Sequence, residues 1–408
     1  MRQNLEYKQP LRFSKAVGRG LVIATSLFLV ACQSSNFGVS GTQNDQQNNT
    51  PRVLSANPKG DVFGQGTVRV ALLLPKSAAG NGAAVANEIR NGALLAMSDF
   101  GNKTLQLVIK DTAGQASSAQ GVANEAVLEG SSAIIGPLFS GSVSAASGIT
   151  QPANVTMFAF STDTSVAKRG VYLISFTPQG DTKRMITFAA SKGRRSVLAL
   201  LPNNAEGALR ESVLKKVAAT SGMVVSVVKY DRNAESIRSA IGASSSQLEG
   251  ADSIYIPDGG PVPGIMLSTM KELGLSIKGK QVLGSGNWET VKLSDRSLSG
   301  ALYPKRDISN FTAFAQRYQT TYNSKPGVQA ALGYDAVTLV SELVRQNGAK
   351  RAFSSSVIEN RRGFTGTNGL FRLLSNGTTE RGLAIYQINN GREQLVSPAP
   401  KTFSRSGS

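Results

Sequence analysis

The feature that most constrains the fold is a strand pattern followed by a helix pattern, repeated along most of the chain. The first repeat opens at residues 68–75, a run of β-branched and leucine residues ended by proline, which is typical of a strand buried on both faces. Residues 83–100 then place apolar side chains three and four positions apart, as on one face of a helix. Strands alternating with helices over about 30 residues predict parallel sheets with right-handed crossovers.

The repeats form two consecutive series. The first series continues with three strand patterns and two helix patterns, which lie at 105–111, 116–129, 133–136, 141–153 and 156–160. The second series starts after Phe176 and alternates helix and strand patterns at about 180, 196–201, 206–220, 224–230, 235–246, 253–256 and 264–273. Two such series predict an α/β fold of two doubly wound parallel-sheet lobes joined by a hinge.

The first 67 residues are predicted to lie outside this fold. Residues 1–19 carry five basic residues and one acidic residue, and residues 20–31 carry no charge. A basic segment followed by a short apolar run is typical of an export signal, and this run is too short to span a bilayer of about 30 Å. Residues 32–67 are rich in Gln, Asn, Ser and Gly, so we expect a flexible tether, with a short tail at 396–408.

The only cysteine, Cys32, follows the apolar run directly. This arrangement resembles the signal of bacterial lipoproteins, in which the cysteine is lipidated and becomes the first residue after cleavage. The resemblance implies a membrane anchor, and several acyl chains such as palmitate anchor more firmly than one. The alternative is a buried cysteine in an uncleaved anchor. Gln33 and Ser34 stand where an aspartate would retain the protein in the inner membrane, which resembles outer-membrane sorting in the periplasm of Gram-negative bacteria.

The amino-acid composition excludes several common kinds of catalytic site. The 408 residues include no histidine, which excludes Ser-His-Asp and Cys-His catalytic sites and His-ligated metal sites. Asp111, Asp163 and Asp258 fall in predicted loops, where spaced aspartates are more often helix caps than a catalytic carboxylate pair. We therefore expect no enzymatic activity, no cofactor and no metal site.

The net charge favours anionic surfaces over nucleic acid. The formal charge of +18 falls to +14 once the five positive and one negative charges of residues 1–31 are removed. The rest is dispersed in short clusters such as 192–195, 215–216 and 361–362, and only 6% of residues are aromatic. Nucleic-acid binding needs a basic stripe with aromatic residues. Lipid headgroups, wall polymers or an acidic protein partner fit this pattern better.

The folded region resembles a known family, the type I periplasmic binding proteins, which include the leucine/isoleucine/valine-binding proteins of ABC importers. The resemblance extends over about 68–395 and rests on the order and spacing of five features, which are Pro75, Asp111, Gly-Pro-Leu-Phe-Ser at 136–140, Phe-Ser-Thr-Asp at 160–163 and Gly-Tyr-Asp-Ala at 333–336. Within the superfamily, the segments 135–139, 159–163 and 170–173 are most similar to lipoproteins described as penicillin-binding protein activators.

The family's topology implies where the remaining segments belong. Helix patterns near 310–322 and 328–346 would return to lobe 1, and short strand patterns with Asn-Gly turns over 363–389 would close lobe 2. Each expected lobe is then composed of two segments. Lobe 1 contains 68–177 and about 301–350, and lobe 2 contains 178–300 and about 351–395. Two or three crossings at the hinge would permit closure on a ligand.

Candidate ligand-binding residues in lobe 1 follow the predicted strands. Ligands of doubly wound sheets bind beyond the carboxyl ends of the strands, so the loops at 75–83, 111–116, 136–142 and 160–165 matter most. Ser140 and Gly141 lie at the start of a helix, where backbone N–H groups favour an anion, although Ser140 is also a candidate helix cap. Thr162, Asp163 and Thr164 follow the fourth strand. The resemblance implies that Ser140, Thr162 and Thr164 hold the carboxylate and amino group of an amino-acid ligand.

Lobe 2 departs from the amino-acid-binding pattern. Its candidate loops are 202–207, 257–263 and 284–289. Glu206 stands before Gly207, where the family presents an aromatic residue, and the family's acidic partner for the ligand ammonium is missing after Leu283. Asp258 and Trp288 are candidates to replace these groups, as a charge and a stacking surface. The alternatives are a loop cap for Asp258 and a core ring for Trp288.

Two functions follow from the resemblance. The first is a lipid-anchored regulator of the cell envelope that contacts a penicillin-binding protein, a peptidoglycan synthase, and stimulates peptidoglycan synthesis. Such a regulator would sense a small polar ligand in its cleft. The second is a receptor that delivers a branched-chain or other amino acid to an ABC permease. Binding of a free amino acid would distinguish the importer receptor from the regulator.

Overall fold

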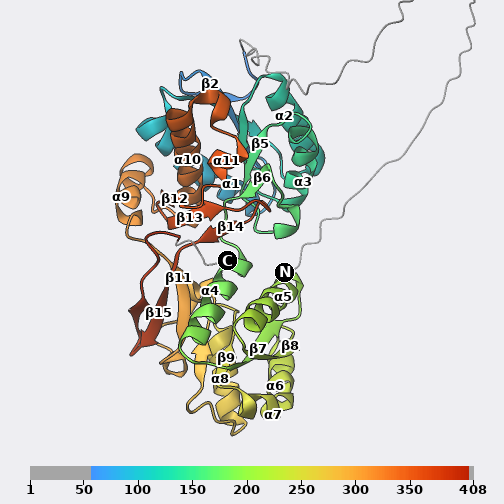
Figure 1. Ribbon diagram of the computed structural model, residues 1–408, viewed down its shortest axis with the longest axis vertical. Helices are drawn as coiled ribbons and strands as arrows, with labels where there is room; N and C mark the ends of the chain where they lie inside the picture. The colour runs from blue at the N-terminus through green and yellow to red at the C-terminus, as the bar shows by residue number, and fades with distance from the viewer. Residues whose placement is uncertain (1–56, 404–408) are drawn as a thin grey trace, which may run out of the picture. The chain divides into compact units, whose positions relative to one another are not determined.

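The computed structural model describes residues 57–403 and contains two large sheets and one small sheet (Figure 1). The first large sheet has the strand order β1-β3-β2-β4-β5-β6 and is parallel except for β1. Its strands are β1 (Asp61–Phe63), β2 (Val68–Leu74), β3 (Leu105–Asp111), β4 (Ala133–Ile135), β5 (Thr156–Ala159) and β6 (Val171–Leu173).

Alternate side chains of β2 pack on opposite faces of the first sheet, as expected for a strand buried on both sides. Val70 and Leu72 belong to the core under α1 and α10, whereas Ala71 and Leu73 pack with α2 and α3. Figure 1 shows these two helix pairs on either side of β5 and β6. The helices are α1 (Gly82–Ala96), α2 (Ala116–Leu128), α3 (Ser140–Thr150) and α10 (Val328–Arg351), and a π-helical turn, Met97–Gly101, extends α1.

The second large sheet has the order β16-β15-β11-β10-β9-β7-β8, in which β15 and β16 are antiparallel to their neighbours. Helices α4 and α5 cover one face and α6 and α8 cover the other. The strands are β7 (Ser196–Pro202), β8 (Val224–Tyr230), β9 (Ser253–Tyr255), β10 (Gln281–Leu283), β11 (Leu302–Arg306), β15 (Leu383–Asn389) and β16 (Arg392–Ser397). The helices are α4 (Pro178–Ser191), α5 (Ala205–Thr220), α6 (Ala234–Ala243) and α8 (Val262–Glu272).

Short elements complete the described chain, and the third sheet has the order β12-β13-β14. They are β12 (Phe364–Gly366), β13 (Gly369–Leu373), β14 (Thr379–Arg381), α7 (Ser245–Gly250), α9 (Phe311–Tyr322), α11 (Ser355–Ile358) and the 3-10 turns η2 (Thr164–Val166), η3 (Gly286–Thr290) and η4 (Arg296–Leu298). Among residues 57–403, no helix has the length and apolar character that crossing a membrane requires.

The α/β fold with two doubly wound lobes is confirmed, but two segments belong to the other lobe. β11 was expected in lobe 1 and instead joins the second sheet, with Leu302 beside Leu283 of β10. The strands β12–β14 were expected in lobe 2, yet Phe371 and Leu373 pack in the same core as β2, α1 and α10. Short strands carry little information about their partners, so long-range pairing decides which sheet they join.

The boundaries of the tether and the tail also differ from expectation. β1 pairs antiparallel with β3 through Asp61 and Ile109, so the last residues of the expected tether belong to the first sheet. At the other end β16 extends to Ser397, and Ala399 is buried. The predicted signal at 1–31 and the lipid attachment at Cys32 lie outside the described residues.

The chain passes between the lobes at three places within residues 57–403. It leaves the first sheet after β6 and enters α4, it leaves β11 for α9 and α10, and it leaves β14 for β15. Crossings of this kind are places where a hinge can bend. They bring Thr177, Arg306 and Arg381 to the region between the carboxyl ends of the two large sheets.

Candidate functional site

A cleft of about 960 Å³ lies between the carboxyl ends of the two large sheets. This is the position at which doubly wound sheets bind ligands, and the volume suits a small molecule. Both sheets supply polar side chains to it. Its polar and charged lining residues include Thr162, Asp163, Asp181, Glu206, Arg210, Asn287, Glu289, Arg306 and Arg381.

The first wall of the cleft presents Thr162 and Asp163, which follow β5. The Asp163 carboxylate accepts a hydrogen bond of 3.0 Å from the backbone N–H of Ser165. Hydrogen bonds from the hydroxyl and amide of Ser165, together with the Ser140 hydroxyl, hold the pKa of Asp163 below its ordinary value. Both side chains are exposed, and among the described residues the Thr162 hydroxyl has no hydrogen-bond partner. Thr162 and Asp163 can therefore both contact a ligand.

Three other residues predicted for lobe 1 do not line the cleft. Ser140 is the first residue of α3 rather than its cap, which is Phe139, and the Ser140 hydroxyl is directed to Asp163. Gly141 follows Ser140 on the helix and has open space around it. Thr164 accepts a hydrogen bond from the Gln179 side chain. The structure thus brings Ser140 and Thr164 close to the candidate site without exposing them to the cleft.

An aromatic ring covers the loops at 75–83 and 111–116, which were expected to matter most. A Cβ atom built on Gly82 would lie 3.1 Å from the Phe139 ring, and one on Gly114 would lie 3.2 Å from it. The Phe139 ring therefore packs against Gly82 and Gly114, and a larger residue at either position would crowd the ring.

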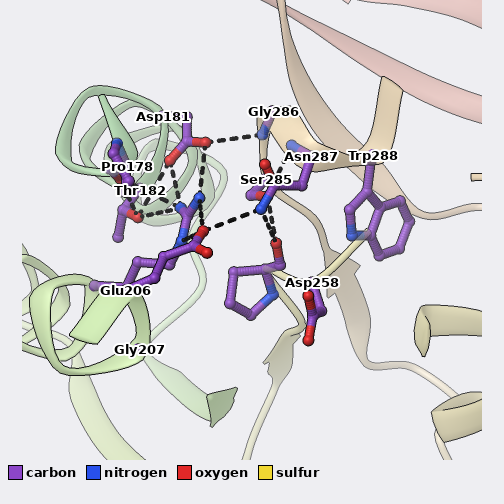
Figure 2. A network of polar contacts seen from close by, with 12 residues as sticks. Pro178, Asp181, Thr182, Glu206, Gly207, Asp258, Ser285, Gly286, Asn287 and Trp288 are labelled. Atoms are coloured by element: carbon purple, nitrogen blue, oxygen red, sulfur yellow. Dashed lines mark hydrogen bonds and ion pairs between the residues drawn. The ribbon is translucent and has the colours of Figure 1, made fainter. Parts of the chain in front are cut away.

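The second wall of the cleft is built around a buried arginine, Arg210, and Figure 2 labels the residues Asp181 and Glu206 that bind it. Its Nη1 donates to Asp181 Oδ1 at 2.6 Å, and its Nε donates to Glu206 Oε1 at 3.0 Å. Asp181 Oδ2 also accepts from the backbone N–H of Gly286 at 2.9 Å, and Asn287 Nδ2 donates to Glu206 Oε1 at 3.1 Å. The network therefore joins the starts of α4, α5 and η3.

Charge pairing keeps this arginine protonated. Burial by itself would lower the pKa of Arg210, but Tyr255, Asp181 and Glu206 outweigh burial and raise the pKa above its ordinary value. The Tyr255 hydroxyl accepts from Arg210 Nη1 at 3.1 Å, and burial raises the pKa of Tyr255 to about 12. Asp181 and Glu206 are thus both bonded to Arg210, whereas the third carboxylate of this wall, Glu289, pairs with Arg306 at 3.3 Å. Glu206 is the more exposed of the two and faces the cleft.

The predicted roles of Asp258 and Trp288 are corrected by their surroundings. Trp288 is completely buried, and its Nε1 donates to the carbonyl oxygen of Ile256 at 2.8 Å. It is a core ring of the second lobe and offers no stacking surface to the cleft. Asp258 accepts from the Tyr230 hydroxyl at 2.6 Å and from Arg232 Nε at 2.8 Å. Its carboxylate is engaged inside the second lobe rather than exposed to a ligand.

Sequence patterns did not reveal the charged residues near the crossings. The Arg381 guanidinium stacks on Phe176 at 4.1 Å, and burial lowers the pKa of Arg381 to about 10 against the opposing effect of Asp335. Arg306 Nη1 donates to Asn368 Oδ1 at 2.8 Å. In a short strand pattern such arginines resemble solvent-facing residues. Only for Arg210 was there a signal, its spacing of four residues from Glu206 on a helix.

Metal binding was not expected, and among residues 57–403 no group of three or more Asp, Glu or Cys side chains is placed to hold a metal ion. The cleft offers hydroxyl, carboxylate, amide and guanidinium groups. These groups can bind a polar solute through hydrogen bonds and ion pairs.

Comparison with known proteins identifies the family. Residues 67–393 match the model of a periplasmic binding protein family. The chain belongs to this family of periplasmic binding proteins. The type I resemblance is confirmed by this match and by the solved structures described below. Members of the family bind solutes and are not enzymes, and the family is periplasmic. No curated protein matches the chain.

Solved structures of solute-binding proteins share the fold. A putative branched-chain amino acid ABC transporter protein from Rhodospirillum rubrum has a TM-score of 0.69 at 17% identity, covering 81% of this chain and 99% of its own. A substrate-binding protein from Desulfitobacterium hafniense in complex with Leu has a TM-score of 0.57 at 18% identity, covering 81% and 99%. A solute-binding protein from R. palustris in complex with benzoate has a TM-score of 0.55 at 19% identity, covering 82% and 98%.

Proposed function

We propose that this periplasmic binding protein binds a small polar solute in its cleft and presents the solute to the permease of an ABC importer. The observation that carries the proposal is the cleft of about 960 Å³ lined by polar side chains from both lobes. Its fold relatives include proteins described as branched-chain amino acid transporter components. An amino acid is therefore the first candidate ligand.

Thr162 and Asp163 are the proposed contacts of this ligand on the first wall. Asp163 is exposed, and the lowered pKa of its carboxyl keeps it ionised at neutral pH. An exposed carboxylate beside a free hydroxyl suits an ammonium group, because both can accept hydrogen bonds from it. Arg381 and Arg306 line the same cleft, but Arg306 pairs with Glu289 at 3.3 Å. Among the described residues, Arg381 Nε and Nη1 have no hydrogen-bond partner, so Arg381 is the proposed partner of a ligand carboxylate.

Calorimetry tests this proposal. The chain from Gln33 to Ser408 would be titrated with branched-chain, acidic and other amino acids. We expect micromolar binding of one ligand class with a negative heat-capacity change, since closure of the cleft buries apolar surface. Asp163→Asn should weaken that binding about 10- to 100-fold, the usual effect of losing a charged hydrogen bond.

The matched control is Glu272→Gln. Glu272 is an exposed carboxylate paired with Arg238 and does not line the cleft. The Glu272→Gln variant should therefore bind the ligand with an unchanged dissociation constant. Absence of binding to every amino acid, or equal losses in the two variants, would contradict the proposed role of the cleft.

The ion pairs within the second wall of the cleft favour a second candidate function. Asp181 and Glu206 are both bonded to Arg210, which leaves fewer free groups for a ligand on that side. We propose as the alternative that the protein regulates peptidoglycan synthesis by contacting a penicillin-binding protein, anchored to the outer membrane through lipid at Cys32. Recovery of a peptidoglycan synthase by pull-down through the lipidated protein, together with no amino-acid binding, would favour this function over import.

A further inference from the structure

One group of basic residues at an edge of the first lobe has little counter-charge. Residues 57–403 contain 37 Lys and Arg against 24 Asp and Glu. Many of these cations pair with carboxylates, but in this group only one cation forms an ion pair. The group comprises six exposed residues, called here the α11 basic surface, which are Lys168, Arg169, Lys350, Arg351, Arg361 and Arg362.

Hydrogen bonds locate this surface at the amino ends of β5 and β6. Phe353, two residues after Arg351, accepts a bond of 3.2 Å at its carbonyl oxygen from Thr156, the first residue of β5. Arg169 lies two residues before β6 and pairs with Glu359 at 2.9 Å. The end of α10, the short helix α11 and the turn before β6 therefore lie together. They are at the edge of the sheet opposite to the cleft.

Counter-charge is almost missing from the α11 basic surface. Glu359 is its one carboxylate and is bound by Arg169 and by the Tyr172 hydroxyl at 2.9 Å. Within residues 57–403, the other five cations have no carboxylate within 4.0 Å. The nearby Glu342 is taken by Arg345 at 2.6 Å. The six positive charges repel one another, and a single negative charge does not neutralise them. Together they attract an anionic surface.

The amino-terminal segment enters the first lobe along the outer strand β1, whose first residue, Asp61, lies opposite Ile109 of β3 and pairs with Lys76 at 2.7 Å. The backbone N–H of Lys59 donates to the Glu129 side chain at 2.9 Å, directly after α2. The Glu129 carbonyl oxygen accepts from Arg69, the second residue of β2, which places Glu129 at the amino edge. From Cys32 to residue 57 the chain can span at most about 80–90 Å when fully extended. A lipid at Cys32 would therefore keep residue 57, and with it the first lobe, close to the membrane.

We propose that the α11 basic surface docks on the anionic phospholipid headgroups of the membrane to which the protein is anchored. Phosphate headgroups attract clustered Lys and Arg side chains, and each such cation near the surface raises membrane affinity by about fivefold. Docking at this edge leaves the cleft, at the opposite edge of the sheet, open to solute or partner. The proposal does not depend on which ligand occupies the cleft.

Vesicle sedimentation tests the proposal without the lipid anchor. The chain from Gln33 to Ser408 would be mixed with vesicles of phosphatidylcholine alone and with vesicles that also contain phosphatidylglycerol. We expect sedimentation only with the anionic vesicles, and a loss of binding as salt is raised. The variant K350Q/R351Q/R361Q/R362Q should lose at least about 50-fold in vesicle affinity.

A second quadruple variant is the matched control. K192Q/R195Q/K216Q/K278Q removes the same charge from exposed cations of the second lobe that have no carboxylate partner among the described residues. It should keep most of the vesicle affinity, and both variants should keep the wild-type thermal midpoint. Equal losses in the two variants would show attraction by net charge alone and overturn the proposal. So would failure of the wild type to bind anionic vesicles.

Discussion

Single residues decide which charges of the cleft are free and which are engaged. Thr162 and Asp163 remain open to the cleft, whereas Asp258 is held by Arg232 and Tyr230. Sequence position alone does not separate these cases, because each aspartate follows a predicted strand. The difference comes from neighbours contributed by other elements. Arg232, for example, lies 26 residues before Asp258 in the chain.

Arg210 should be the most sensitive charged residue of the second lobe. In Arg210→Ala, the Asp181 carboxylate loses its cation while it remains largely buried, so we expect a loss of about 3–5 kcal/mol in the free energy of unfolding. Urea unfolding measures this loss. Arg238→Ala is the control, since its pair with Glu272 is exposed and should contribute only about 0–1 kcal/mol. Similar losses in the two variants would contradict a buried, tightly coupled network.

At the scale of elements, α1 and α10 contact each other closely. A Cβ atom on Gly92 would lie 1.8 Å from the carbonyl oxygen of Ala330, and one on Gly333 would lie 2.1 Å from that of Ile89. Each helix therefore requires a glycine where it meets the other. The two helices are separated by more than 200 residues in sequence, so helix patterns predicted each of them but not their contact.

Two glycine substitutions in helices should have opposite effects. Gly92→Ala forces the α1 and α10 backbones apart, and we expect a loss of about 1–3 kcal/mol in unfolding free energy. Gly121→Ala in the exposed face of α2 meets nothing within 4 Å and should stabilise the protein by about 0.5–1 kcal/mol. Denaturant midpoints of both variants check the two signs. A stabilising Gly92→Ala would show that the helices can separate without cost.

Most strands and helices agree with the sequence patterns, and the differences have local causes. β3 and β8 have the expected boundaries, because runs rich in β-branched and leucine residues favour strands both in the buried β3 and in the partly exposed edge strand β8. The helix expected at 235–246 ends at Ala243, and α7 begins at Ser245. β1 was missed because three residues at an antiparallel edge carry no clear alternation.

At the scale of the whole molecule, three crossings of the chain connect the two lobes, and the cleft lies between them. A ligand that contacts both walls of the cleft should therefore stabilise both lobes against unfolding. At a ligand concentration 100 times the dissociation constant, we expect about 2.7 kcal/mol of added stability. The single tryptophan, Trp288, lies in the core of the second lobe, and its fluorescence reports the unfolding of that lobe. Circular dichroism reports both lobes.

The expected outcome is an equal upward shift of the thermal midpoint by both signals. A shift in circular dichroism with an unchanged Trp288 transition would mean that only the first wall, with Thr162 and Asp163, holds the ligand. That result would contradict closure of the two lobes on the solute. Alanine at Thr162 should reduce the shift at a fixed ligand concentration, because it removes a free hydroxyl from the wall.

The sequence by itself determined the fold class and the edge of each sheet at which the cleft lies. Apolar runs and helical spacing are local properties, and parallel strands place their carboxyl ends at one edge. Tertiary structure alone decided that β11 joins the second sheet, that Trp288 is a core ring and that Arg210 and Arg381 reach the cleft. The physical reason is that burial and charge pairing depend on groups from distant segments, which local patterns do not encode.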